Sequence, residues 1–411
     1  MARESATVTR QPTSREIGIG LAVTVGLLFG VLVLQVATHE ARRYDFGVLY
    51  TAGLIVREGD GAKLYNLGEQ AEAEERVLER KGLLPFTHPP FEALAIAPLS
   101  LLPYWCAYLA WGAMNIVLWM WFAYLVRPYV PIPKQTFRYL ILCLAFFPAW
   151  IVLFQGQTSI LLLLLFTLVF ISLKREKDFR AGIFLARGLL RFQIVLPFAL
   201  ILLLLRKWRV MAGFSLTAGV LATVSVLVVG IAGMRSYILL MLYLVEHATD
   251  PLFAAVSNPR RMPTVRGFFG TLLQGGLPST WSSTFIAILC VSLILLACWQ
   301  WQRHRSLERA FSCALVASFL AGFHVHPHDL VLLLLPILLM AGELRRTITK
   351  AAVTVLYLPV YPILAYFDSL YWLFWVVAIF GASLFGLGEA HAGTLTAVFE
   401  ERPSGEQTVG R

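Results

Sequence analysis

Apolar segments recur along almost the whole chain and are separated by short polar stretches. The first, Ile17 to Ala37, is long enough to cross a bilayer, which takes about 20 apolar residues, and no small-residue cleavage site follows it. We therefore expect an anchor helix rather than a removed signal. Further spans are predicted near Phe91–Pro103, Trp105–Val126, Tyr139–Phe154, Ser159–Leu173, Ala181–Leu205, Val210–Ala232, Trp281–Trp301, Ala310–Phe323, Leu330–Ala341, Ala351–Tyr366 and Leu370–Leu387. The pattern predicts an all-α, polytopic transmembrane protein with about 12 membrane segments.

Basic residues set the expected orientation of this protein. Arg3, Arg10 and Arg15 precede the first span, and the positive-inside rule therefore places its start in the cytoplasm. An even number of spans returns the end of the chain to the same side. The predicted organisation is a cytoplasmic tail at 1–16, a membrane domain at 17–388 with external loops at 38–90 and 234–280, and a cytoplasmic tail at 389–411.

The basic loops agree only in part with strict alternation of the spans. Alternation places Arg206 to Arg209, Gln302 to Arg305 and Glu343 to Arg346 in the cytoplasm, as the positive-inside rule requires. Two other basic loops, Arg127 to Arg138 and Lys174 to Arg180, come out external. We therefore expect one segment in the first half of the chain to be re-entrant rather than spanning.

The longest polar stretch follows the first span. Within it, LGEQAEAEERVLERKG, from Leu67 to Gly82, is rich in helix formers and ends in glycine. This composition predicts a short amphipathic helix that lies along the membrane interface.

Composition limits the class of protein. Hydrophobic residues make up 58% of the chain and charged residues 14%, and the mean hydropathy of +0.72 excludes a water-soluble fold. The net charge of +10 would suit a nucleic-acid-binding protein, but the basic residues lie in short clusters between apolar runs. Such clusters are typical of membrane topology, so we expect membrane lipids and no nucleic acid as partners.

Three polar segments are expected on the same external face. They are the segment that carries Asp45, the loop from Met234 to Thr280, and the HVHPHD turn from His324 to Asp329. A functional site is therefore sought on this face.

Asp45 lies in RRYDFGVLYTAG, just past the end of the first predicted helix. An acid at a helix exit is commonly only solvated by water, and the sequence leaves that interpretation open. The neighbouring segments favour a function, because an apolar-aromatic stretch follows Asp45 and the chain later re-enters the membrane through the rigid THPP segment. A carboxylate at such a partly apolar boundary is suited to act as a general base.

The FHVHPHDL turn carries His324, His326 and His328 next to Asp329. Three imidazoles so close could bind a metal, but a proline interrupts them and no cysteine or carboxylate cluster completes a metal pattern. A metal is therefore left open but not expected. We favour contact of one imidazole with a substrate phosphate or hydroxyl, and an ordinary polar turn is the alternative.

Arginines beside apolar segments need a compensating partner, because placing one at the centre of a bilayer costs about 2.5–3.5 kcal/mol. Arg187 and Arg191 are four residues apart in FLARGLLRFQIVLP and are predicted to share one helix face. Arg260, Arg261 and Arg266 lie in the long external loop. An anionic lipid head group suits both clusters, because guanidinium groups match the geometry of a phosphate. Generic attraction to anionic lipid explains the second cluster equally well.

Several short motifs together resemble the glycosyltransferase 87 family. They are the aspartate just after the first helix, DGAKLYN, THPP, PLSLLP and GQTSILLLLL, and the resemblance covers roughly Tyr44 to Pro336. This family belongs to the C-type glycosyltransferases, which depend on polyprenol-phosphate sugars, and it includes mycobacterial mannosyltransferases. The resemblance implies a multi-helix enzyme of the bacterial cytoplasmic membrane. Such an enzyme takes a sugar, typically mannose, from a polyprenyl-phosphate donor at the extracytoplasmic face and transfers it to a lipid or glycan acceptor.

The resemblance also implies roles for particular residues. Asp45 would be the catalytic base, and His326 would lie in the active site as a catalytic residue. A single displacement would invert the anomeric carbon, and no cofactor is expected because the lipid-phosphate sugar carries its own leaving group. The sequence departs from the family at LLRFQ, where the family often has Lys-Pro. The residues expected to bind substrate are His88, Gln157, Arg187, Arg191, Arg260, Arg261, Arg266, His324, His328 and Asp329.

A transporter or flippase of lipid-linked sugars or small solutes is the main alternative. Such proteins commonly show repeated halves and polar residues at the midplane of the membrane. No convincing internal repeat is visible, and most polar candidates fall on one face, which favours chemistry at the interface. A structural or assembly role explains the aspartate and histidine segments least well.

Overall fold

The structure is a computed structural model that describes residues 14–38, 45–79, 83–131, 136–247, 250, 253–274, 276, 279–304, 306–344 and 346–386. These residues form helices and no strand, which confirms the predicted all-α class. The α-helices are α1 (Ser14–Ala37), α2 (Phe46–Arg57), α3 (Leu67–Leu78), α4 (Pro90–Ile96), α5 (Tyr104–Val126), α6 (Thr136–Leu144), α7 (Phe147–Gln155), α8 (Ser159–Lys174), α9 (Asp178–Arg187), α10 (Phe192–Leu204), α11 (Trp208–Glu246), α12 (Ala254–Ser257), α13 (Val265–Leu272), α14 (Ser279–Arg303), α15 (Leu307–Ala321), α16 (Leu334–Leu339), α17 (Thr347–Tyr357), α18 (Val360–Tyr366) and α19 (Leu373–Leu384). The 3-10 helices are η2 (Gly61–Lys63), η3 (Ala97–Leu101), η4 (Arg127–Tyr129), η5 (Gly188–Arg191), η7 (Pro259–Arg261), η8 (Pro327–Leu333) and η9 (Leu370–Trp372).

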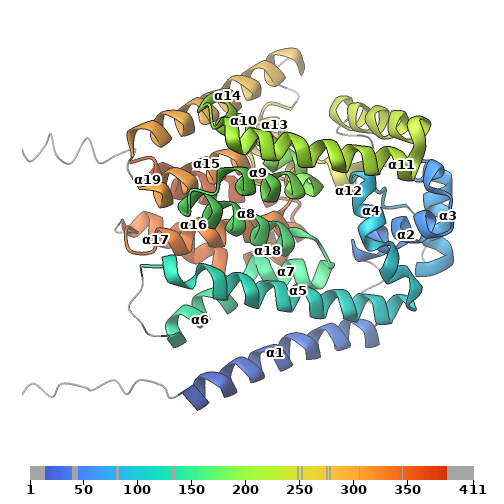
Figure 1. Ribbon diagram of the computed structural model, residues 1–411, viewed down its shortest axis with the longest axis horizontal. Coiled ribbons are helices and arrows are strands. Elements are labelled where there is room, and N and C mark those ends of the chain that lie inside the picture. The colour runs from blue at the N-terminus through green and yellow to red at the C-terminus, as the bar shows by residue number, and fades with distance from the viewer. Residues whose placement is uncertain are drawn as a thin grey trace, which may run out of the picture.

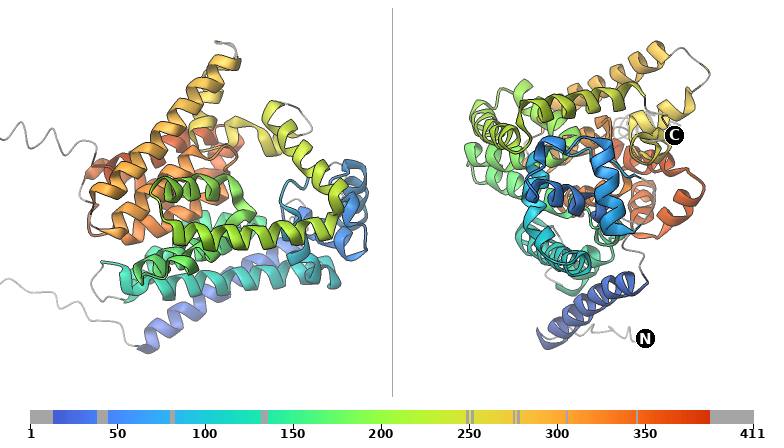
Figure 2. Two further views of the ribbon diagram at one scale, coloured as in Figure 1. Left: turned by 45° about the horizontal axis from the view of Figure 1, so that its top comes forward. Right: turned by 90° about the vertical axis from the view of Figure 1, so that its right-hand side faces the viewer.

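The longer helices run along the longest axis of the molecule, so the bundle has two ends (Figure 1). The short helices α2, α3 and α4 cover one end, which we call the capped end; it faces the viewer in the right panel of Figure 2. We call the opposite end, where α1 begins and α19 ends, the basic end. Helix α1 lies along one side of the bundle and packs mainly on α5, where Leu32 fits against Gly112.

Ion pairs join several helix connections at the basic end. Lys174 Nζ, at the end of α8, lies 2.6 Å from Glu308 Oε1 at the start of α15. Arg309, in the first turn of α15, pairs with Glu343 in the connection that follows α16. The α8–α9 turn, the start of α15 and the connection between α16 and α17 therefore meet at this end.

Strict alternation of the predicted spans separates two basic loops from the others, which led us to expect a re-entrant segment. Both loops lie at the basic end. Lys174 to Arg180 forms the α8–α9 turn, and the loop that begins at Arg127 packs against Gly342 through Pro131. The segment predicted as a span at Phe91–Pro103 forms only the short α4 and η3, which stay at the capped end beside α2. If Phe91–Pro103 does not cross the membrane, alternation of the remaining spans moves both loops from the external to the cytoplasmic side.

The stretch Asp178–Leu204 turns back on itself at Arg191. Its length and apolar composition suit one membrane span, but the backbone leaves the helical region at Arg191 (φ −122°, ψ 60°). Val210, six residues after Leu204, packs against Gly182 near the start of α9. Six residues reach at most about 20 Å, whereas a straight helix would separate residues 182 and 204 by about 33 Å. Helix α10 therefore returns toward the basic end, and Arg191 occupies the tip of a helical hairpin.

Two glycines allow α9 and α11 to pack with their backbones in contact. A Cβ atom at Gly182 would lie 2.0 Å from the carbonyl oxygen of Val210, and one at Gly213 would lie 2.1 Å from that of Phe179. No side chain fits at either position, so glycine is required for this approach.

Burial separates the central helices from the outer ones. The apolar side chains of α8, α15 and α16 are almost all buried, as expected of helices that are apolar on every face. Helices α11 and α14 instead expose large apolar side chains such as Leu227 and Ile288, which is typical of surfaces that face lipid. The described residues contain four stretches long and apolar enough to cross a membrane, and the pair α17 and α18, bent by 76°, would make a fifth. The count of about 12 segments stays a prediction.

The two predicted external loops contain helices. The described part of 38–90 includes α2, which is largely buried, and α3, which confirms the predicted short helix; Gly82 lies outside the described residues. In the second loop, α11 continues to Glu246, and α12, η7 and α13 follow. Of the predicted tails, only residues 14–16 are described.

The DGAKLYN motif fixes the capped end against α11. A Cβ atom at Gly61 would lie 2.2 Å from the carbonyl oxygen of Val228, so only glycine permits this contact. Helix α11 bends at Gly230, two residues after Val228, and the φ of 70° at this position suits glycine.

Candidate active site

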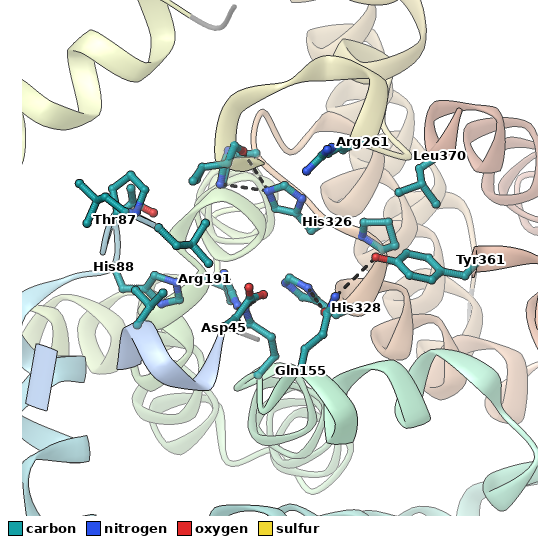
Figure 3. A pocket seen from close by; sticks show the side chains of 18 residues that line it. Asp45, Thr87, His88, Gln155, Arg191, Arg261, His326, His328, Tyr361 and Leu370 are labelled. Carbon is teal, nitrogen blue, oxygen red and sulfur yellow. Dashed lines mark hydrogen bonds between the residues drawn. The ribbon is translucent and has the colours of Figure 1, made fainter. Parts of the chain in front are cut away.

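A cavity of about 460 Å³ lies between the capped end and the central helices (Figure 3). Segments far apart in the sequence meet there: the start of α2, the THPP segment, the α7–α8 turn, the tip of the α9–α10 hairpin, η7, the HVHPHD turn and α18. The polar side chains that line it are Asp45, Thr87, His88, Gln155, Gln157, Arg191, Arg261, His324, His326, His328 and Tyr361.

Asp45 stands directly before the first residue of α2. Its side chain does not cap the helix, and its carboxylate points into the cavity (Figure 3). The Nε2 amide of Gln157 donates a hydrogen bond to Oδ2 of Asp45 at 2.5 Å. This contact leaves Oδ1 available to a substrate hydroxyl.

The GQTS motif forms the turn that holds Gln157 in place. Gly156 ends α7 in the left-handed conformation (φ 67°), and a Cβ atom there would lie 2.5 Å from Cβ of Phe46, beside Asp45. The indole of Trp111 donates to the carbonyl oxygen of Gly156 at 2.8 Å, which fixes the turn. The glycine thus brings Gln157 close to α2, and Ser159 then starts α8.

Arg191 extends the network from Asp45 into the core. Its Nη2 donates to Oε1 of Gln157, and its Nε lies 3.7 Å from Oδ1 of Asp329. Ser159 donates to the same Asp329 oxygen at 2.6 Å. Arg191 and Asp329 are both buried, so this pair holds two charges away from water, where they need each other and their hydrogen bonds.

The histidine turn is locked by its own hydrogen bonds. The carboxylate of Asp329 accepts from the backbone N–H of His326 at 3.0 Å, and the backbone N–H of Asp329 donates to the backbone carbonyl oxygen of His326 at 2.9 Å. Nε2 of His326 also donates to the carbonyl oxygen of Val256 at 3.0 Å and lies 3.3 Å from Nε2 of His324. Nε2 of His326 therefore contacts two neighbouring segments, which suits this residue to hold the turn.

Burial lowers the pKa of all three imidazoles of this turn, His328 included. Burial, more than the charges of His326 and Arg266, places the pKa of His324 well below its usual value. Burial also lowers the pKa of His326, although the nearby Asp329 carboxylate opposes this shift. The turn therefore adds hydrogen-bonding groups to the cavity without adding positive charge.

His88 forms a second pair with a carboxylate on the cavity wall. Its Nδ1 lies 2.9 Å from Oε2 of Glu92, four residues later in the first turn of α4. Because the carboxylate can only accept, Nδ1 carries the proton and Nε2 of a neutral ring is left as an acceptor. The consecutive prolines of THPP begin α4 and so fix the direction of this pair.

The predicted arginines fall into three groups. Arg191 and Arg261 line the cavity, and Arg261 also forms a half-exposed ion pair with Asp368 at 3.3 Å. Arg266 lies beside a small adjoining cavity and donates to the carbonyl oxygen of Phe323 at 2.7 Å. Arg187 and Arg260 do not line the active-site cavity. The expectation that Arg187 and Arg191 share one helix face is wrong, because α9 ends at Arg187 and Arg191 lies at the hairpin tip.

The other predicted residues of the histidine turn are His324, His328 and Asp329. His324 and His328 line the cavity, whereas Asp329 is fully buried behind it. Nδ1 of His328 contacts Oε1 of Gln155 at 3.0 Å. Among the residues that the structure describes, no three His, Cys, Asp or Glu side chains are arranged to hold a metal ion. This arrangement therefore gives no support to metal binding.

Sequence reasoning missed four residues of this site. Gln155 links His328 to Tyr361 of α18, with its Nε2 3.5 Å from the Tyr361 hydroxyl (Figure 3). Glu92 lies in the first turn of α4 whereas His88 precedes that helix, so their spacing of four residues did not by itself predict the contact. Thr87 stands beside His88 in the motif. Tyr361 comes from a late apolar segment and had no signal in the sequence.

The comparisons with known proteins agree with this arrangement. The model of glycosyltransferase family 87 matches residues 86–325, more than half of the 411-residue chain. Searches of curated proteins and of solved structures found no match. The matched region includes the THPP segment, the α7–α8 turn, the α9–α10 hairpin and η7, which together supply six of the eleven polar side chains that line the cavity. The chain therefore belongs to glycosyltransferase family 87 and is a membrane glycosyltransferase.

Proposed function

We propose that this enzyme transfers mannose from a polyprenyl-phosphate donor to a lipid or glycan acceptor, with inversion at the anomeric carbon. The observation that carries the proposal is the Asp45 carboxylate, which points into the cavity with one oxygen bound to Gln157 and the other available. Asp45 and His326 lie outside the family match, so their proposed roles rest on their positions in the cavity.

The proposed reaction is a single displacement. The acceptor hydroxyl oxygen attacks the anomeric carbon while its proton passes to Oδ1 of Asp45. The bond between that carbon and the phosphate oxygen breaks, and its electron pair leaves with the polyprenyl phosphate. A general base of this kind contributes about 10²- to 10⁴-fold to a rate.

Cations on and beside the cavity suit the phosphate of the donor and of the leaving group. Arg261 lines the cavity, and its partner Asp368 is partly exposed, so a phosphate can compete for it. Arg266 is partly buried beside the adjoining cavity, where its charge acts in a medium of lower polarity than water. Arg191 adds charge at the hairpin tip. Such preplaced cations stabilise the developing phosphate charge.

The orientation of the protein follows from its two ends. We propose that the basic end faces the cytoplasm of a bacterial cell and that the capped end, with the cavity, faces the extracytoplasmic side of the cytoplasmic membrane. The correction of the loops at Arg127 and Lys174 supports this orientation, because they now join the other basic loops.

The proposal needs no cofactor, since the donor carries its own leaving group. Thr87, Gln155 and Tyr361 offer hydrogen bonds to sugar hydroxyls on the cavity wall. Two observations disfavour the transporter alternative. The chain belongs to a glycosyltransferase family, and most of the predicted polar residues line one cavity at the capped end.

Transfer by purified protein in lipid bilayers tests this function. The protein is supplied with polyprenyl-phosphomannose or with a nucleotide-linked mannose, together with a panel of host lipid and glycan acceptors. We expect mannosylated product only with the lipid-linked donor, and the new bond should have the anomeric configuration opposite to that of the donor. Product formed from the nucleotide sugar alone, or with retained configuration, would contradict the proposal.

A further inference from the structure

A second cavity, of about 450 Å³, opens at the basic end of the molecule. It lies between the end of α5 with η4 and the α8–α9 turn, at the opposite ends of α8 and α9 from the active-site cavity. Four cations line it, and no acidic residue of the described chain does: the cations are Arg127, Arg175, Lys177 and Arg180. We call it the basic-end cavity.

The charges of these cations are not neutralised within the described protein. None of the four forms an ion pair there, although Glu176 and Asp178 occur in the same turn. Lys174, by contrast, is paired with Glu308 at 2.6 Å. Cations that converge on one cavity repel one another, so an anion bound between them would be stabilised.

Aromatic contacts hold two of the guanidinium groups in place. The guanidinium carbon of Arg127 lies 4.9 Å from the ring centre of Tyr139, and that of Arg180 lies 5.2 Å from the ring centre of Phe184. Contacts of this kind orient the planar group while its N–H donors remain able to bind an anion. The cavity is therefore partly preorganised for a ligand with several acceptor oxygens, such as a phosphate.

The rim of the cavity has the features of a bilayer boundary. Trp121 and Tyr124 of α5 line it and are 49% and 77% exposed, and Val117, one turn earlier than Trp121, is 64% exposed. Exposed Trp and Tyr at the end of an apolar helix mark the level of lipid headgroups. An apolar strip therefore leads along α5 from the cavity toward the middle of the membrane.

We propose that the basic-end cavity binds the phosphate headgroup of an anionic phospholipid, with its acyl chains lying along the exposed apolar side of α5. The cations supply charge-assisted hydrogen bonds to the phosphate. The apolar strip favours a lipid over a free phosphate ion, because only the lipid has chains to cover it. This site is separate from the active-site cavity and does not depend on the proposed sugar transfer.

Lipid binding to the purified full-length chain tests the site. Native mass spectrometry counts bound lipids during titration with phosphatidylglycerol, and phosphatidylcholine, inorganic phosphate and glycerol 3-phosphate serve as comparison ligands. The test variant is Arg175→Gln/Arg180→Gln, whose side chains are exposed. The control variant is Lys207→Gln/Arg209→Gln, which removes the same charge at the same end but does not line the cavity. Equal melting temperatures without added lipid establish that both variants are folded.

The site predicts one tight phosphatidylglycerol that phosphatidylcholine does not replace. In the test variant its affinity should fall about 30-fold, at about 1 kcal/mol for each cation, while the control variant keeps the wild-type value. Equal loss in both variants would mean generic attraction to the surface and would overturn the proposal. So would the absence of a tight lipid, or displacement of the lipid by glycerol 3-phosphate at equal concentration, which would indicate a free-phosphate site.

Discussion

The two cavities of this protein have nearly equal volumes, about 460 and 450 Å³. They differ in whether their charged side chains are paired with one another. In the active-site cavity the polar groups bind one another: Gln157 joins Asp45 to Arg191, and Arg191 pairs with Asp329. In the basic-end cavity the cations have no ionic partner within the described protein. The first arrangement fixes groups for chemistry, and the second leaves charge for a ligand to neutralise.

Burial explains why the two ends differ. Arg191 and Asp329 lie within the core, where an unpaired charge would be very costly, so a network is required. Arg175, Lys177 and Arg180 are exposed at the basic end, where water solvates them. A mutation should therefore affect stability strongly at the first site and ligand binding alone at the second.

Loss of Arg191 should have the largest effect. Arg191→Gln leaves Asp329 buried without its cation, which we expect to lower the free energy of unfolding by about 3 kcal/mol. Sugar transfer should fall at least about 100-fold, since a preplaced cation is also lost. Phosphatidylglycerol binding at the basic-end cavity should not change.

The matched control is Arg187→Gln, which removes an exposed arginine four residues earlier. It should reduce transfer by less than about twofold and leave the melting temperature within the range usual for surface substitutions. Thermal unfolding and transfer assays measure both variants. Equal effects of the two substitutions would contradict the distinction drawn between the hairpin tip and the end of α9.

The helix pair that connects the two ends offers the next test. In Gly182→Ala the new methyl group would overlap the carbonyl oxygen of Val210, and we expect a loss of about 1–3 kcal/mol of stability as α9 and α11 separate. Gly219→Ala is the control on α11, because nothing lies within 4 Å of the position that its new methyl group would take. It should be neutral or slightly stabilising, as alanine favours a helix. Thermal unfolding in lipid distinguishes the two, and equal destabilisation would refute the close packing.

The pH dependence of stability gives the smallest expected effect. Because burial lowers the pKa of His324, the unfolded chain takes up a proton at higher pH than the folded chain does. Stability should therefore fall as the pH drops below about 6.5, by about 1 kcal/mol for each buried imidazole between pH 6.5 and 5.5. His324→Gln should reduce this slope in thermal unfolding measured against pH. An unchanged slope in His324→Gln would contradict a neutral, buried ring.

The sequence predicted the helical class and much of the cavity. Long apolar runs identify membrane helices directly, and THPP, GQTS and HVHPHD marked three of the segments that meet. These segments line one cavity together with Asp45. The packing reason for GQTS was not visible, because it depends on Gly156 lying against Phe46, a contact between residues far apart in the chain.

Other features could not be predicted from local pattern. Phe91–Pro103 and Asp178–Leu204 both have the composition of a span, yet the first stays at one end and the second folds back at Arg191. Tertiary contacts, such as that of Gly182 with Val210, determine where the chain turns back. The hydropathy of a segment does not show these contacts. Gln155 and Tyr361 were missed for the same reason, since their contact joins α7 to α18.

The most direct test of the account is mannose transfer by Asp45→Asn compared with Asp60→Asn. Both substitutions replace a carboxylate by an amide near the capped end, but Asp60 pairs with Lys63 at the surface and does not line the cavity. With polyprenyl-phosphomannose as donor and both variants folded in lipid, we predict that Asp45→Asn lowers the rate at least about 1,000-fold. Asp60→Asn should keep the wild-type rate. Unchanged transfer by Asp45→Asn would contradict the assignment of Asp45 as the base.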